Sequence, residues 1–398
     1  MRKIAAHYLF PLCGEPVKMG YLCLNTDNVI TEIGSLDRES ESTEFYDGIL
    51  CPGFVNSHCH IELSHLKDKF TRNSGMAGFI RQINSLRESS DRSERLRVIG
   101  REMDKLYDSG VSAMADISNC DDSFSVKSSS PLYTRTFLEV FGTESEEAES
   151  IVKNVKTLQD LSRSYNIDAG ITPHSPYTMS TRLLSESAKE ALKVGWLSYH
   201  NQESWEEDEL IRYGKGPLAD EYKSRGLSTP PVTGNSPLKY FLSVLDSVRK
   251  RGDSKIKENI LLVHNTFSDE ESVDAAMEMI ENLFWAICPL SNLFIHSSLP
   301  PVELLRRKGS KITIGTDSLS SNSILSMTEE MKTLQRYFPY IALDQMLKWA
   351  CYNGAAFLKK EKELGSFEVG KKPGVVLISN VDYSQMKLTN ESNSRRIV

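Results

Sequence analysis

Histidine and acidic side chains follow several short apolar runs in this chain of 398 residues. His58 and His60 are two residues apart, and in an extended segment such residues point to the same side, so both imidazoles can reach one ion. An isolated pair of this kind is a weak signal. It gains weight because other apolar runs end in polar groups that packing does not require. The residues in this position are His58, His60, His200, His264 and Asp317.

The middle of the chain alternates short apolar runs with amphipathic stretches. The candidate strands are 49–56, 113–117, 134–140, 169–172, 196–199, 259–263, 284–287 and 312–314. The candidate helices are 76–88, 94–108, 147–164, 181–194, 271–282 and 326–338. This alternation predicts βαβ units and a parallel sheet, most simply a (β/α)₈ TIM-type barrel, with a doubly wound open sheet as the alternative. In a barrel, the polar residues that follow the strands meet at the carboxyl-terminal mouth.

Both ends of the chain are rich in short β-prone runs broken by Gly, Pro and Asp-Asn. We therefore expect residues 1–50 and 365–398 to form one composite β-sandwich domain, and residues 51–364 to form the barrel. The segment 204–237 is acidic at first and then rich in Gly, Pro and Ser. It directly follows a candidate ligand strand, so it is either a solvated surface excursion or a lid over the site.

Composition limits the classes of function. The formal net charge of −7 argues against a surface for nucleic acid, which needs concentrated Lys and Arg. The seven scattered cysteines indicate a reducing compartment, and no run approaches the length of a membrane-spanning helix. We expect a cytoplasmic protein that acts on a small molecule and binds neither nucleic acid nor membrane; a homo-oligomer is compatible with this composition.

Several motifs resemble those of one enzyme family. Pro52–His60 is similar to the first-strand signature of the amidohydrolase superfamily. Later motifs resemble its chlorohydrolase and nucleobase or nucleoside deaminase branch: His200–Glu203, Val263–Asn265, Cys288–Asn292, Gly315–Ser318, Asn353–Ala356 and Gly365–Lys371. The resemblance covers roughly residues 1–380. The chain departs from it at Pro373–Gly374, far from the candidate site, where relatives usually carry Ala-Asp.

The resemblance implies one metal ion. Binuclear relatives place a carboxylated lysine at the end of the fourth strand, whereas Gly170–His174 contains no lysine. The implied ligands are His58, His60, His200 and Asp317, which suit Zn²⁺ and are also accepted by Fe²⁺. Such an ion lowers the pKa of bound water from about 15.7 towards 7.

The family mechanism assigns roles to three catalytic residues. Asp317 accepts a proton from the water, Glu203 protonates a ring nitrogen of the substrate, and His264 steadies the attacking oxygen.

Candidate substrate-side residues rest on weaker analogies. His174 resembles a substrate-contacting histidine of purine-nucleoside deaminases. The segment that begins at His60 resembles aminodeoxyfutalosine deaminases, which makes Glu62 and Arg87 candidate contacts, although Phe79 and Ile83 nearby have the spacing of a core-facing helix stripe. Ser291 and Asn292 either line the pocket or brace the eighth strand. Glu139 adds a carboxylate at the end of the third strand, and His296 is a further candidate.

The expected function is hydrolytic deamination of an aminated purine-type base or nucleoside. Hydrolysis of a chloride or a cyclic amide on the same scaffold is an alternative, since fold and metal do not determine the leaving group. A catalytically inactive binding protein is the third reading, disfavoured because every expected ligand is present. A cytidine-type zinc deaminase is disfavoured because its H-x-E and P-C-x-x-C signature is absent.

Overall fold

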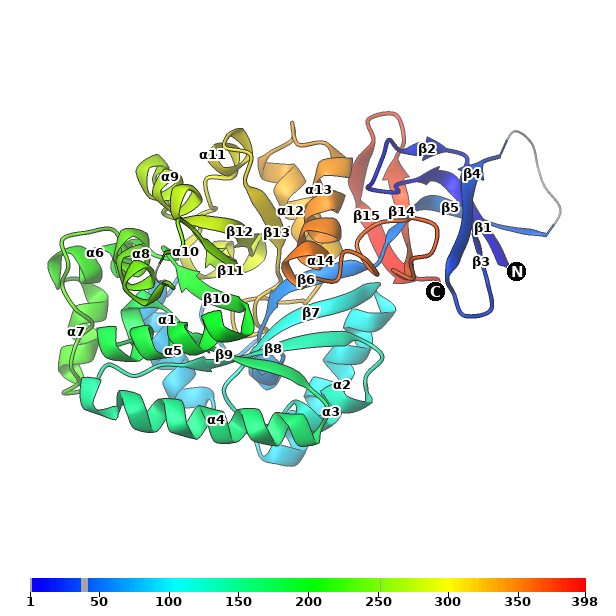
Figure 1. Ribbon diagram of the computed structural model, residues 1–398. Helices are drawn as coiled ribbons and strands as arrows, with labels where there is room; N and C mark the ends of the chain where they lie inside the picture. The colour runs from blue at the N-terminus through cyan, green and yellow to red at the C-terminus, as the bar shows by residue number, and fades with distance from the viewer. Residues whose placement is uncertain (1, 37–41, 251) are drawn as a thin grey trace.

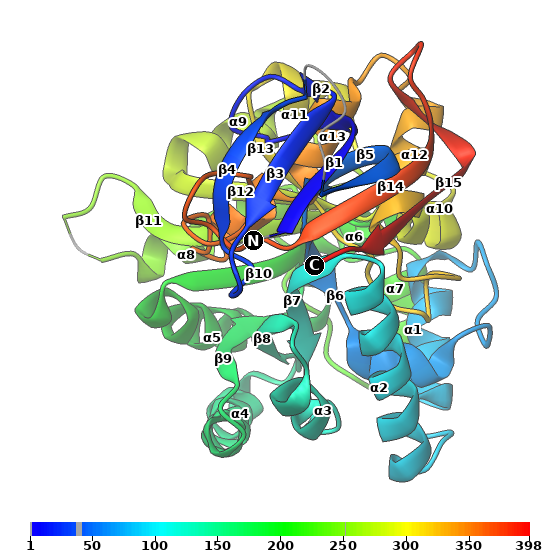
Figure 2. The same cartoon turned by 90° about the vertical axis from the view of Figure 1, so that its right-hand side faces the viewer.

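The computed structural model describes residues 2–36, 42–250 and 252–398 and contains three β-sheets (Figure 1). One sheet combines strands from both ends of the chain, and the other two are parallel sheets of four strands each. Figure 2 shows strands β1, β3, β14 and β15 of the first sheet side by side, with both chain termini beside them. No helix among the described residues is long and apolar enough to cross a membrane.

The terminal sheet has the strand order β15-β14-β5-β1-β3-β4, with β2 paired to β1. Its strands are β1 (Arg2–Leu9), β2 (Val17–Lys18), β3 (Gly20–Leu24), β4 (Ile30–Ser35), β5 (Thr43–Pro52), β14 (Val375–Asp382) and β15 (Lys387–Arg396). Strand β5 runs parallel to β1 and antiparallel to β14, so the two chain ends are joined by backbone hydrogen bonds. The two-sheet sandwich predicted for these residues is not confirmed, because their described parts pair into a single sheet.

Each parallel sheet follows chain order, β6-β7-β8-β9 and β10-β11-β12-β13. The strands are β6 (Phe54–Cys59), β7 (Val111–Ser118), β8 (Tyr133–Val140), β9 (Asp168–Pro173), β10 (Trp196–Asn201), β11 (Ile256–His264), β12 (Ile280–Ile287) and β13 (Lys311–Ile314). Backbone hydrogen bonds link the two sheets at both edges. The His200 N–H donates to the His174 carbonyl at 2.9 Å, and the N–H groups of Thr316 and Asp317 both donate to the His58 carbonyl at 3.0 Å.

Helices cover the outer faces of both parallel sheets (Figures 1 and 2). For example, α4 packs on β8 and β9, and α9 packs on β12. The α-helices are α1 (Gly75–Leu86), α2 (Arg92–Asp108), α3 (Phe124–Ser129), α4 (Ala148–Ser164), α5 (Thr181–Val194), α6 (Trp205–Tyr213), α7 (Pro217–Ser224), α8 (Pro237–Val248), α9 (Glu270–Met279), α10 (Pro289–His296), α11 (Val302–Arg307), α12 (Met327–Tyr337), α13 (Leu343–Ala350) and α14 (Tyr352–Phe357). Short 3-10 helices are η1 (Ile61–Leu66), η2 (Ser145–Glu147) and η3 (Pro176–Thr178).

Two predicted boundaries are wrong. The apolar run 49–56 is divided at Gly53 into β5 of the terminal sheet and β6 of a parallel sheet. A side chain at Gly53 would collide with Ser112 and the Pro373 carbonyl, so glycine allows the chain to pass between the two sheets. The helix expected over 271–282 ends at Met279, because the β-branched Ile280 begins β12. The other seven predicted strands each lie within an observed strand.

A buried ion pair lies inside the first parallel sheet. Lys127 of α3 and Asp116 of β7 are 2.5 Å apart, with side chains 1% and 0% exposed. Asp116 also accepts the backbone N–H of Ile61 at 2.9 Å, which holds the chain directly after His60. This pair therefore connects the packing of α3 to the strand end that carries two histidines.

We predict that Lys127→Met destabilises the protein by about 3–5 kcal/mol, because it leaves the Asp116 carboxylate buried without a cation. The control is Lys189→Met, since Lys189 is 43% exposed and pairs with Glu186, whose side chain is 45% exposed. Its loss should cost less than about 1 kcal/mol. Urea denaturation measures the free energy of unfolding of both variants. Equal losses would contradict the prediction that the buried pair contributes more to stability than the exposed one.

Candidate active site and metal centre

Four predicted ligands meet where β6, β10 and β13 end. The Asp317 Oδ1 atom lies 3.8 Å from His58 Nε2 and 3.7 Å from His60 Nε2. The Nε2 atoms of His60 and His200 are 3.2 Å apart. Donors bound to one zinc ion at about 2.0–2.1 Å lie roughly 3.3 Å from one another, so these separations match a shared ion.

His58 shows most directly that the cluster suits a metal. Its side chain is fully buried, yet neither ring nitrogen has a hydrogen-bond partner within the described parts of the chain. A buried imidazole without partners is costly unless something else satisfies it. His58 belongs to two groups whose potential ligand atoms lie within 4.8 Å of one another, one with His60 and Asp317 and one with His200 and His264. Such groups fit a divalent cation, so the residues present suit the expected ion.

Neighbouring groups orient the ligands. His200 directs Nδ1 to the His174 carbonyl at 3.1 Å, which leaves Nε2 free to ligate. The Oδ2 atom of Asp317 accepts hydrogen bonds from Ser291 at 2.5 Å and Ser321 at 2.9 Å, so Oδ1 remains directed at the histidines. Ser291 therefore braces the aspartate, which is the second of the two roles that the sequence left open.

Two site residues occupy the left-handed backbone region. His264 has a φ of 68° and Asp317 a φ of 56°. Residues other than glycine adopt such angles at a cost of about 1–3 kcal/mol each, commonly at functional sites. Here the turn at each strand end directs the side chain toward the cluster.

Burial and neighbouring charges determine which groups of the site carry a proton near pH 7. Burial lowers the pKa of His58 and His200 well below the ordinary value, and it lowers that of His264 to about 4. The imidazoles of these three residues are therefore neutral near pH 7, the form that can ligate a metal. Burial would raise the pKa of Asp317, but the neighbouring His264, His60 and His58 outweigh it and bring the value to about 2.

Glu203 differs from Asp317 in charge state. Burial, with the nearby Asp317 and Glu207 carboxylates, raises the pKa of Glu203 well above its usual range. Its Oε2 accepts a hydrogen bond from the Tyr177 hydroxyl at 3.1 Å, and its Oε1 lies 3.5 Å from His264 Nε2. The site thus places a protonated acid next to an ionised aspartate.

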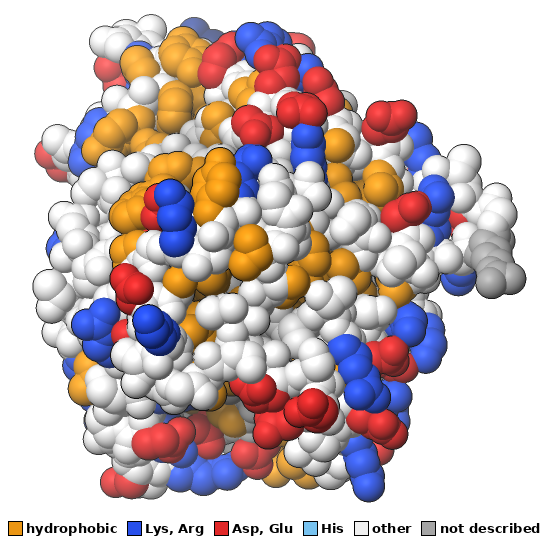
Figure 3. All heavy atoms as spheres, turned by 90° about the vertical axis from the view of Figure 1, so that its left-hand side faces the viewer, with side chains coloured by type: hydrophobic (Ala, Val, Ile, Leu, Met, Phe, Trp, Pro, Cys, Tyr) orange, Lys and Arg blue, Asp and Glu red, His pale blue; other side chains and the backbone are white. Residues whose placement is uncertain are grey.

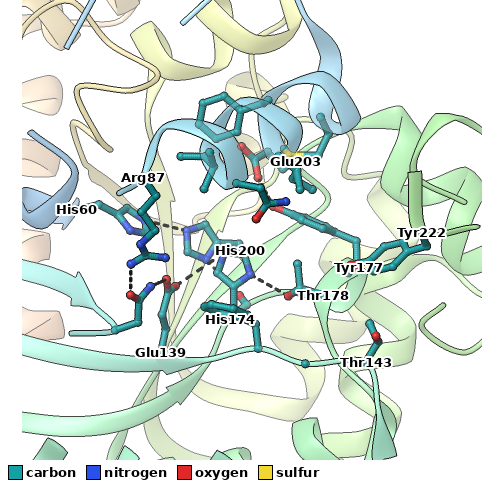
Figure 4. Close-up of a pocket in the computed structure, with 18 of the residues that line it drawn as sticks. His60, Arg87, Glu139, Thr143, His174, Tyr177, Thr178, His200, Glu203 and Tyr222 are labelled. Carbon is teal, nitrogen blue, oxygen red and sulfur yellow. Dashed lines mark hydrogen bonds and ion pairs between the residues drawn. The ribbon is translucent and has the colours of Figure 1, made fainter. Parts of the chain in front are cut away.

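A cavity of about 400 Å³ opens in front of these groups (Figure 4). His60, His200, His264, Asp317 and Glu203 all line it. One wall is apolar and comes mainly from α1, which contributes Met76, Phe79, Ile80 and Ile83. The helix stripe expected to face the core thus faces the cavity at Phe79 and Ile83.

The segment 204–237 contains α6, α7 and the start of α8. Tyr222, Arg225 and Leu227 from this segment line the cavity. Ser228 donates its backbone N–H and its hydroxyl to Glu144, across the cavity mouth, at 2.9 Å each. Figure 3 shows the face that carries α6 and α7, where hydrophobic side chains gather over the middle and upper part.

The predicted substrate-side residues separate into two groups. His174 and Arg87 line the cavity (Figure 4). Glu62 and Asn292 do not line it. Glu62 is buried behind Arg87, which donates to it at 2.8 Å. Asn292 lies behind His264 and donates its amide to Nδ1 at 3.2 Å, so the predicted substrate contacts of both residues are replaced by supporting ones.

One further candidate lies outside the cavity. His296 is not among the residues that line the cavity, and its ring instead faces Phe267. Cys59 and Cys288, which adjoin the site motifs, are fully buried in apolar clusters.

Sequence reasoning assigned no role to Tyr177 and Asn119. Tyr177 lies three residues after His174, and this closeness in sequence was the one pattern that could have pointed to it. In the structure its side chain is buried, where a tyrosine hydroxyl usually finds a hydrogen-bond partner. Asn119 directly follows β7, so it fits the pattern of polar residues after apolar strands that identified the other site residues. Asparagine is also common in turns, however, and the pattern alone does not distinguish the two roles.

The sequence profile of the amidohydrolase family matches residues 49–398. The chain belongs to the amidohydrolase family. Among relatives of this amidohydrolase are two deaminases. An adenosine deaminase of Helicobacter pylori is 26% identical over 361 residues, covering 87% of this chain and 84% of the relative. A 5-methylthioadenosine/S-adenosylhomocysteine deaminase of Thermoanaerobacter pseudethanolicus is 26% identical over 376 residues, covering 88% and 78%.

The amidohydrolase fold is shared with solved structures. The crystal structure of Helicobacter pylori aminofutalosine deaminase in complex with methylthio-coformycin superposes with a TM-score of 0.80, with 22% identity and full coverage of both chains.

We predict that the purified amidohydrolase binds about one divalent ion per chain and that His58→Ala loses most of it, since a missing imidazole leaves three ligands. The matched control is His7→Ala, which removes an imidazole of the terminal sheet that is 39% exposed. Metal analysis by mass spectrometry after gel filtration measures the ratio. Full metal content in His58→Ala would exclude this histidine as a ligand.

Proposed function

We propose that this amidohydrolase removes the amino group of a 6-aminopurine nucleoside by hydrolysis, using one metal ion, with Zn²⁺ favoured and Fe²⁺ accepted by the same ligands. The observation that carries this proposal is the position of Glu203. A buried carboxyl with a raised pKa lies 3.5 Å from His264 and lines the same cavity as the ligand cluster. Deamination needs such an acid, because a ring nitrogen must be protonated before water can add to the adjacent carbon.

The bound ion would supply a water of lowered pKa. The protein's own groups then handle the protons. Because the Tyr177 hydroxyl donates to Oε2, neutral Glu203 carries its proton on Oε1 and gives it to the ring nitrogen. Ionised Asp317 accepts one proton from the water and passes it to the departing amine, and the second water proton goes to Glu203, which restores the acid. Because Asn292 donates to Nδ1 of His264, Nε2 carries a proton and donates toward the attacking oxygen.

The comparisons support the choice of leaving group. The sequence relatives are named for deamination of adenosine and of 5-methylthioadenosine or S-adenosylhomocysteine. They favour deamination over the release of chloride or the opening of a cyclic amide. The apolar wall from α1 suits a flat heteroaromatic ring or an apolar 5′ substituent.

The proposed architecture has three parts. We infer that the two parallel sheets form one (β/α)₈ barrel over residues 51–364, supported by the backbone hydrogen bonds at both edges. Residues 1–50 and 365–398 form a composite terminal domain, supported by the pairing of β5 with β14. The segment 204–237 acts as a lid, supported by the contribution of Tyr222, Arg225 and Leu227 to the cavity wall.

We predict that Glu203→Gln lowers kcat by about 10²–10⁴-fold because it removes the proton donor. Metal content should stay unchanged. Ammonia release from adenosine, 5′-methylthioadenosine and an aminofutalosine-type nucleoside is the measurement. The control is Glu209→Gln in α6, whose carboxyl is 34% exposed and should not affect turnover. An unchanged kcat in Glu203→Gln, or no ammonia from any nucleoside with metal-loaded protein, would contradict the proposal.

A further inference from the structure

One carboxylate oxygen in the cavity wall has no hydrogen-bond donor among the residues that the structure describes. Glu139 ends β8 with its side chain 5% exposed, and it lines the cavity. Its Oε1 accepts the Asn119 side-chain amide at 2.9 Å. Its Oε2 is buried and has no hydrogen-bond partner within residues 2–36, 42–250 and 252–398. The His174 Nε2 atom lies 3.8 Å away, too far for a hydrogen bond.

The position of this oxygen is held by a chain of polar contacts. Arg87 donates both to Glu62 and to the Asn119 side-chain carbonyl, which turns the Asn119 amide toward Glu139. Oε1 is thereby occupied and Oε2 is left directed at the cavity. A buried acceptor is stable only with a donor, so a ligand that displaces water from this corner must bring an O–H or N–H of its own.

The chemistry of the substrate class identifies that donor. This step rests on the proposed function. In a 6-aminopurine nucleoside the amino group must lie at the ligand cluster, and the ring carries no other N–H because the sugar occupies its glycosidic nitrogen. The remaining donors are the sugar hydroxyls. A hydroxyl oxygen about 2.8 Å from both Glu139 Oε2 and His174 Nε2 can bond to both atoms, since they are 3.8 Å apart.

We infer that Glu139, with His174 beside it, recognises a ribose hydroxyl and makes the enzyme selective for ribonucleosides over the matching deoxynucleoside. The alternative occupant of this corner is a second metal ion, because Glu139, His174 and His200 offer ligand atoms within 4.8 Å of one another. The ribose reading is favoured because Nε2 of His200 already faces His60 in the first cluster and its Nδ1 faces the His174 carbonyl.

The test compares adenosine, 2′-deoxyadenosine and 3′-deoxyadenosine. The wild-type enzyme should prefer adenosine over at least one deoxy analogue by about 100-fold or more in kcat/KM, since a site built around a hydroxyl rejects the analogue that lacks it. Glu139→Gln keeps the size of the side chain but turns an N–H₂ toward the cavity. In Glu139→Gln, kcat/KM should fall for adenosine but not for the deoxy analogue that the wild-type enzyme rejects. The ratio of the two kcat/KM values should therefore shrink below about tenfold.

A control variant and three possible results test the inference that Glu139 binds a ribose hydroxyl. The control Glu149→Gln changes a carboxyl of α4 that is 88% exposed and does not line the cavity, and it should leave the preference unchanged. Equal wild-type turnover of all three nucleosides would overturn the inference while the deaminase activity stands, and this comparison needs no variant that folds. If the wild-type chain binds a second ion and Glu139→Gln loses that ion, Glu139 is a metal ligand, and the inference of ribose recognition is overturned as well. No ammonia from any nucleoside would remove the proposed function and this inference together.

Discussion

The site depends on the backbone contact between the end of β13 and the end of β6. The His58 carbonyl accepts the N–H groups of both Thr316 and Asp317, and this pair of hydrogen bonds joins the second parallel sheet to the first. It also brings the Asp317 carboxylate to within 4 Å of His58 and His60. The left-handed backbone at Asp317 is the conformational cost of that turn. His58 and His60 lie at the end of a strand of one sheet and Asp317 follows a strand of the other, so this contact brings the aspartate to the two histidines.

The same burial produces opposite charge states in two carboxyls. Asp317 has three imidazoles nearby and two hydroxyl donors, and its pKa falls to about 2. Glu203 has the Asp317 and Glu207 carboxylates nearby instead, and burial raises its pKa well above the usual range. A neutral acid and an ionised base within one cavity are what hydrolytic deamination requires, because a proton must reach the ring nitrogen while another leaves the water.

The sequence predicts those features of the site that depend on residues close together in the chain, and it does not predict contacts between residues far apart in the chain. The His58-Cys59-His60 spacing and the polar residues after apolar runs are local patterns, and the structure gathers those residues where parallel strands end. The supporting contacts are not local. Tyr177 reaches Glu203 over 26 residues, and Asn119 reaches Glu139 over 20, with no short pattern that predicts either pairing. Glu62 was proposed as a substrate contact by analogy and Asn292 from its place after the seventh strand, but their side chains contact Arg87 and His264 from behind.

The most direct test of a deaminase with one metal ion is a titration of metal-free protein with Zn²⁺ while ammonia release from adenosine is followed. If His58, His60, His200 and Asp317 share one ion, activity rises in proportion to added metal and reaches its plateau at about one ion per chain. A plateau at two ions, or full activity in protein that contains no metal, would contradict this account.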